Sequence, residues 1–85
     1  MKVQFVEFIP ENIQEDILYI SLEYKTATHL CPCGCMNRVV TPIGGDGWEL
    51  IIHEDTIISL SPSIGNFRWP CKSHYFYRKN KIEWV

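Results

Sequence analysis

The residues best suited to chemistry are cysteines and histidines that gather in two short segments. Cys31, Cys33 and Cys35 are spaced two residues apart, and Cys71 and His74 form a Cys-x-x-His pair about forty positions later. A tetrahedral metal site is commonly built from two such clusters, because the metal joins loops that are distant in sequence. The spacing therefore predicts one metal site between two loops, with Cys31, Cys33, Cys35, Cys71 and His74 as candidate ligands.

These candidates outnumber the four positions of a tetrahedral site. The favoured set is Cys31, Cys33, Cys71 and His74, with Cys35 as the first alternate and His29 as the second. A Cys₃His set accepts Zn²⁺, which needs no redox machinery, and the same residues could instead hold a 2Fe–2S cluster. If Cys35 is the unused thiol, the nearby dication would favour its thiolate and make it a potential nucleophile.

Several serines and one further histidine are weaker candidates. Ser59, Ser61, Ser63 and Ser73 could act as nucleophiles only with an identified base. His53 is interpreted as a surface strand histidine, because no serine or cysteine is tied to it in sequence. Residues 61–66 are predicted to form an ordered turn near the metal loop. With no recognisable active site, the residues favour binding over catalysis.

Length and composition limit the architecture that can hold these loops. The chain has 85 residues, 46% of them hydrophobic, which predicts a single metal-binding domain over residues 1–85 with a marginal core that a metal would supplement. No apolar run approaches the roughly 20 residues that span a bilayer, and Glu7 interrupts the first segment too early for a secretory leader. We therefore expect a cytoplasmic protein without a membrane partner, in a compartment that keeps thiols reduced.

Short apolar segments separated by turn residues predict a mainly β fold. Residues 17–24 alternate between apolar and polar positions, as a half-buried strand does, and residues 10–16 could form a single helical turn. Further strands are expected over residues 3–9, 38–41, 48–53, 56–60, 75–77 and 81–84. Six or seven short strands imply a small antiparallel barrel or sandwich with the metal held between two loops.

The charge distribution marks the C-terminal part of the chain as a partner surface. The net charge is −2, but residues 66–85 carry five basic residues against one acidic residue. Basic and aromatic residues interleave there, a pattern compatible with nucleic acid, but the pI of about 5.8 argues against such a partner. We expect a protein partner on a face that carries Trp69, Tyr75, Tyr77 and Arg78. The alternative is that these rings complete the core around the metal.

Four motifs together resemble a family of small bacterial metal-binding proteins of unknown function. They are residues 29–35 with Val40-Thr41-Pro42, then Ser61-Pro62-Ser63-Ile64-Gly65-Asn66, Pro70-Cys71-Lys72-Ser73-His74-Tyr75 and Ile82-Glu83-Trp84. Members of that family are encoded beside ubiquitin-like conjugation components. The resemblance implies that the partner is a ubiquitin-like modifier or its conjugating enzymes, and that a free Cys35 could carry the modifier as a thioester.

The metal loops alone also resemble two classes of iron–sulfur domain. Cys31-Pro32-Cys33 with Cys71-Lys72-Ser73-His74 is similar to the paired loops of Rieske domains, although Cys33 stands where a Rieske domain has histidine. CDGSH-type proteins share the Cys₃His set, but their loops are closer in sequence. These likenesses imply a Rieske-like or rubredoxin-like fold with a two-loop site. The function expected from the sequence is thus a small zinc-stabilised interaction module, with an iron–sulfur protein or a thioester-carrying factor as alternatives.

Overall fold

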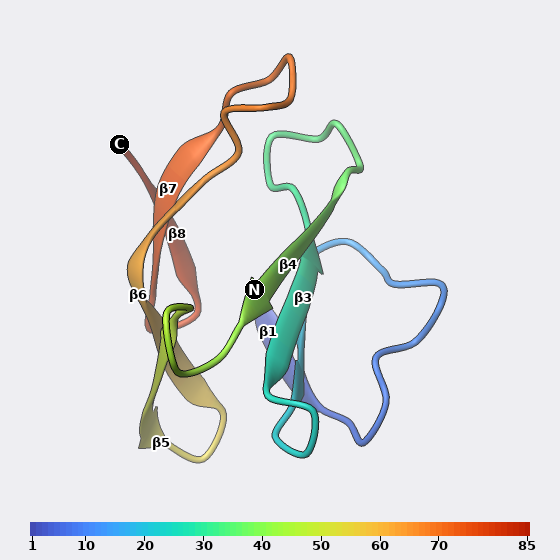
Figure 1. The fold of residues 1–85 in the computed structure, drawn as a ribbon, viewed down its shortest axis with the longest axis vertical. Helices are drawn as coiled ribbons and strands as arrows, with labels where there is room; N and C mark the ends of the chain where they lie inside the picture. Colours follow the sequence, from blue (N-terminus) through green and yellow to red (C-terminus); the bar gives the residue numbers. More distant parts are fainter.

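The protein folds into two four-stranded sheets, described by a computed structural model of residues 1–85 and drawn in Figure 1. The first sheet has the strand order β1-β2-β3-β4, and the second has the order β5-β6-β7-β8. The strands are β1 (Lys2–Phe5), β2 (Ile17–Ser21), β3 (Thr26–Leu30), β4 (Arg38–Pro42), β5 (Glu49–Glu54), β6 (Ile57–Gly65), β7 (His74–Arg78) and β8 (Lys81–Trp84). The chain therefore completes one sheet before it begins the other.

The core lies between the two sheets, to which each sheet contributes alternate side chains. β2 supplies Leu18 and Ile20, while β7 supplies Tyr75 and Tyr77, and all four residues are fully buried. In β7 large side chains are buried at every second position, as one covered face of a strand produces, whereas in β2 Tyr19 and Ser21 are buried as well. The mainly β, sandwich-like fold expected from the sequence is confirmed, and the sheets remain open rather than closing into a barrel.

The first sheet departs from an all-antiparallel arrangement at one edge. β1 pairs with β2 in parallel, with Lys2 opposite Ile17, whereas β2, β3 and β4 pair antiparallel. The expected strand over residues 17–24 ends at Ser21, after which Leu22 and Tyr24 are exposed. β3 was not expected, because its short sequence Thr-Ala-Thr-His-Leu lacks a run of strongly apolar residues.

The helical turn predicted over residues 10–16 is wrong, because this segment contains no helix. Its backbone groups are held by side chains of the first sheet instead. The Arg38 guanidinium donates to the carbonyls of Pro10 and Glu11 at 2.7 and 2.8 Å, and the Gln14 N–H donates to the Tyr19 hydroxyl at 3.0 Å. These hydrogen bonds satisfy the two carbonyls and the N–H group, which in a helical turn would bond to other backbone groups.

The second sheet is a meander in which each strand pairs with the next one along the chain. The strands expected over residues 48–53, 56–60, 75–77 and 81–84 are present, and they form the antiparallel pairs β5–β6 and β7–β8. The turn predicted over residues 61–66 is wrong for residues 61–65, because β6 continues to Gly65. Between β6 and β7 the register shifts, since Leu60 faces Tyr77 and Ile64 faces Tyr75, so residues 61–63 bulge out opposite Phe76. Bulges of this kind redirect side chains and are common beside functional sites.

None of the segments forms an apolar helix long enough to span a membrane.

Candidate functional site

Two loops meet at one end of the sandwich and bring all four cysteines together. One loop joins β3 to β4 and the other joins β6 to β7, and both lie at the same end of the molecule in Figure 1. The first loop carries Cys31, Cys33 and Cys35, and the second carries Cys71. The four sulfur atoms all lie within 4.8 Å of one another.

Backbone geometry turns the first loop so that its thiols converge. The Gly34 N–H donates to the Cys31 carbonyl at 3.2 Å, and the Cys31 N–H donates to the Asn37 carbonyl at 2.8 Å. Gly34 has a φ of 95°, a conformation that glycine adopts without the steric cost of a Cβ. The Cys35 N–H then points at the Cys33 sulfur from 3.4 Å. The hydrogen bond between Cys31 and Asn37 thus closes the loop, and the sulfurs of its three cysteines converge on one point.

The sulfur positions fit a tetrahedral metal ion. Cys31 Sγ lies 3.3 Å from Cys33 Sγ, and Cys35 Sγ lies 3.9 Å from Cys71 Sγ. In a ZnS₄ centre with Zn–S bonds of about 2.3 Å, neighbouring sulfurs are separated by about 3.8 Å. No disulfide uses these thiols. Four sulfurs at these distances can hold a metal ion with only small adjustments.

The electrostatics of the cluster differ from one thiol to the next. The pKa of Cys35 is lowered to about 7, chiefly because the Asn37 N–H stabilises its thiolate. The Cys35 N–H is the largest influence on Cys33 and lowers its pKa, but hydrogen bonds with the neighbouring thiols outweigh it and raise that pKa to about 12. The neighbouring thiols of Cys33 and Cys35 therefore ionise unequally, and a bound cation would favour the thiolate of Cys33 as well.

The two histidines among the expected metal ligands, His74 and His29, contact other residues instead of joining the cysteine cluster. His74 Nε2 is 2.8 Å from Ser63 Oγ. The group of side chains that could hold a metal contains the four cysteines without His74. His29 is fully buried, with its Nε2 atom 2.7 Å from the Tyr75 hydroxyl. Burial lowers the pKa of His29 to about 4, which keeps its ring neutral near pH 7. The structure thus brings together Cys31, Cys33 and Cys71 with Cys35.

Ser63 and His74 form a serine–histidine pair on the outer face of the second sheet. The register shift between β6 and β7 places Ser63 on the bulge, and His74 begins β7. Both residues are half-buried, so solvent and a ligand can reach them. The Phe67 ring packs edge-on against the imidazole, with centroids 5.2 Å apart. A Cβ at Gly65 would collide with that ring, so glycine there allows Phe67 to lie against the strand.

One buried hydroxyl connects this pair to the cysteine cluster. Ser73, the residue before His74, has its Oγ 3.2 Å from Cys31 Sγ and accepts a hydrogen bond from Asn66 Nδ2 at 2.8 Å. The Asn66 N–H also donates to the Ser73 carbonyl at 2.8 Å. The positions of Ser63 and His74 therefore depend on the same loop that delivers Cys71.

A second serine–histidine contact joins His53 Nε2 to Ser59 Oγ at 2.7 Å. The Ser59 hydroxyl also accepts a hydrogen bond from the Lys79 N–H at 2.9 Å, and Ser59 is only 7% exposed. His53 lies on β5 and is exposed, as expected for a surface strand histidine. This contact engages the Ser59 hydroxyl with a second partner and leaves only a small part of the residue exposed.

Comparison with known proteins places the chain in a family. The family model described as "Bacterial ubiquitination-like system serine protease (BubE)" matches residues 5–85. The chain belongs to the BubE family. No curated protein and no solved structure matches it significantly. The association with a bacterial ubiquitin-like system that the sequence motifs implied is confirmed, whereas the protease description was not expected from the sequence.

Sequence reasoning missed the pairing of Ser63 with His74 in this BubE family member. His74 was assigned to the metal because it follows Cys71 at a spacing typical of zinc ligands. A usable signal was present, since a base for Ser63 had to come from one of only three histidines. The register shift that aims Ser63 at His74 has no signature in a single sequence.

The partner face expected from the sequence is wrong for two of its members. Tyr75 and Tyr77 are completely buried and complete the core, as the alternative interpretation held. Trp69 is half-buried and packs against that core, whereas Arg78 is exposed and pairs with Glu83 at 2.8 Å. The two tyrosines of β7 point inward, so the outer face presents His74, Phe76 and Arg78 instead.

Proposed function

We propose that this BubE family member is a serine peptidase of a bacterial ubiquitination-like system, with Ser63 as the nucleophile and His74 as the general base. The observation that carries the proposal is the 2.8 Å contact between Ser63 Oγ and His74 Nε2. A nucleophilic hydroxyl needs a base within hydrogen-bond distance, and this pair satisfies that condition. The family description supplies independent support for a serine protease.

The pair can carry out acyl transfer in two balanced steps. Ser63 Oγ attacks the scissile carbonyl carbon while its proton passes to His74 Nε2, and the tetrahedral intermediate collapses as the amine leaves with that proton. Water then gives a proton to His74 and its oxygen attacks the acyl-enzyme. Release of the carboxylic acid returns the proton to Ser63. The structure gives the His74 ring one hydrogen-bond partner, so the catalytic unit is a dyad.

Ser63 is favoured over Ser59 because its hydroxyl is both accessible and uncommitted. Ser59 Oγ is held between the Lys79 N–H and His53, and its residue is buried. Ser63 is half-buried and its hydroxyl contacts only His74. A nucleophile must reach its substrate, so accessibility decides between the two pairs.

The cysteine cluster is proposed to hold a structural Zn²⁺ through Cys31, Cys33, Cys35 and Cys71. Support comes from four sulfurs that lie within 4.8 Å of one another without a disulfide. A closed four-sulfur set has no open position for a substrate, so the metal would fix the loops rather than take part in hydrolysis. This assignment makes Cys35 a ligand rather than a thioester carrier. A mononuclear iron or 2Fe–2S centre is the alternative, and metal analysis with an absorbance spectrum decides between them.

The substrate class follows from the family. We propose that the peptidase cleaves a ubiquitin-like modifier from a precursor or from its conjugates, which makes the modifier the protein partner. The cytoplasm is the proposed location, because thiol ligands persist in a reducing compartment.

A fluorophosphonate probe tests the nucleophile without knowledge of the substrate. Such probes form a bond between phosphorus and an activated serine oxygen as fluoride leaves, so we expect one adduct on Ser63 by intact mass and peptide mapping. Ser63→Ala should abolish labelling, while Ser61→Ala, an exposed neighbour, should retain it. Labelling of Ser59, or no labelling of the folded protein, would contradict the proposal and favour a metal-stabilised binding domain.

A further inference from the structure

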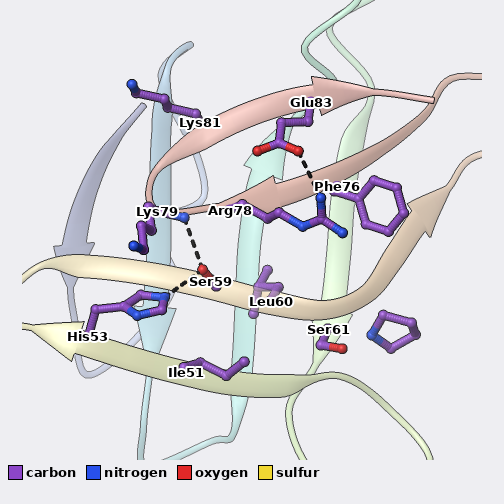
Figure 2. A pocket seen from close by; sticks show the side chains of 11 residues that line it. Ile51, His53, Ser59, Leu60, Ser61, Phe76, Arg78, Lys79, Lys81 and Glu83 are labelled. Carbon is purple, nitrogen blue, oxygen red and sulfur yellow. Dashed lines mark hydrogen bonds and ion pairs between the residues drawn. The ribbon is translucent and has the colours of Figure 1, made fainter.

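The outer face of the second sheet, which carries the serine–histidine pair, also contains a groove whose lining does not include Ser63 or His74. Its volume is about 630 Å³, and its walls come from all four strands of the sheet. Figure 2 shows Phe76 and Ser61 at one end, Arg78 in the middle, and His53, Lys79 and Lys81 at the other end. Pro62, another lining residue, directly precedes Ser63.

The groove and the pair share one face of β7. His74, Phe76 and Arg78 alternate with the buried Tyr75 and Tyr77, so their side chains lie along the outer face. From His74 to Arg78 the strand rises by about 14 Å, a distance that about four residues of an extended peptide would cover. A chain that runs through the groove and continues along β7 from Phe76 toward His74 would place one end beside Ser63.

The charge of the groove is positive in a protein whose net charge is negative. Arg78 is paired with Glu83 at 2.8 Å and lies 4.0 Å from the centroid of the Phe76 ring. Lys79 and Lys81 are exposed and belong to no ion pair in the structure. The groove therefore offers two unpaired ammonium groups beside a pre-positioned guanidinium and an aromatic ring, whereas the whole chain has a net charge of −2.

We propose that this groove binds the substrate as an extended peptide whose acidic side chains, about four residues from the scissile bond, contact Lys79 and Lys81. The inference rests on the proposed function and adds a substrate preference to it. Unpaired cations favour an anionic partner. Phe76 and Pro62 offer an apolar surface to the substrate residues nearer the scissile bond. The second sheet thus acts as a specificity surface in addition to carrying the catalytic pair.

Binding to the Ser63→Ala variant tests the groove separately from catalysis. The probes are two fluorescein-labelled ten-residue peptides of equal length, one with two glutamates and one with two lysines at the same positions. We expect the glutamate peptide to bind about tenfold more tightly at low salt by fluorescence anisotropy, with the difference shrinking as salt screens the charges. Lys79→Glu with Lys81→Glu should reverse this preference, a gain that misfolding cannot produce.

A matched charge control lies on the other sheet. Lys2→Glu with Lys25→Glu changes the net charge by the same amount outside the groove and should keep the parent preference. The groove proposal fails if both peptides bind equally, if the Lys79 and Lys81 reversals bind as the parent does, or if a ten-nucleotide oligothymidine binds more tightly than the glutamate peptide. If the glutamate preference holds but the parent labels no serine and cleaves no peptide, the proposed function fails while the groove stands.

Discussion

Replacement of Cys71 by serine is expected to remove the metal and to lower the melting temperature by at least about 10 °C. Cys71 is the only cysteine that the β6–β7 loop contributes to the cluster, so its loss detaches that loop from residues 31–35. Structural zinc contributes on the order of 10 kcal/mol to folded metal domains, comparable to the whole stability of a small domain. Elemental analysis and differential scanning calorimetry measure the two effects on the same sample.

Two further variants separate a four-cysteine site from the Cys₃His set expected from the sequence. Cys35→Ala should lose the metal as Cys71→Ser does, because its sulfur lies with the other three. His74→Ala should keep full metal content, because its imidazole contacts Ser63 instead. A His74→Ala protein that loses its metal while Cys35→Ala keeps it would restore the Cys₃His assignment. Full metal content in Cys71→Ser would contradict a two-loop site altogether.

Replacement of Ser63 by alanine is expected to lower kcat/KM by at least about a thousandfold, equivalent to about 4 kcal/mol of transition-state stabilisation. The substrate for this measurement is a linear fusion of a ubiquitin-like modifier to a reporter peptide. His74→Ala should cause a loss of the same order, since the serine hydroxyl is a weak nucleophile without its base. The double variant should be no slower than either single variant, because the two residues act as one unit.

Controls for this prediction come from the second serine–histidine contact and from the neighbouring serine. His53→Ala and Ser61→Ala should change kcat less than threefold, because neither side chain contacts Ser63 or His74. Both residues line the groove, so any effect on kcat/KM should come from KM. The metal content of Ser63→Ala should equal that of the parent protein. Equal loss in His53→Ala and His74→Ala, or additive losses in the double variant, would show that Ser63 and His74 are not the reacting pair.

Local sequence patterns were sufficient to predict most strands and the meeting of the two loops. Burial alternates from residue to residue along β7, as a strand with one covered face predicts, whereas in β2 the residues on both faces, Leu18 to Ser21, are buried. The spacing of the cysteines predicted a two-loop site because a metal commonly joins two ligand clusters that are distant in sequence, and the sulfurs of Cys31 and Cys71 do lie together. The parallel β1–β2 pair was beyond such patterns, since strand direction depends on how residues 6–16 cross the first sheet.

The sequence by itself determined the residue types that the protein has available: four thiols, three histidines and a basic C-terminal part. Only the tertiary structure decided which of them join the cysteine cluster and which pair with a serine. His74 is close to Cys71 in sequence and yet points to the outer face of β7. The bulge at residues 61–63 turns Ser63 toward that face, and the inward packing of Tyr75 and Tyr77 sets the phase of the strand. A side chain's face depends on register and core packing, which are long-range properties that spacing along the chain does not encode.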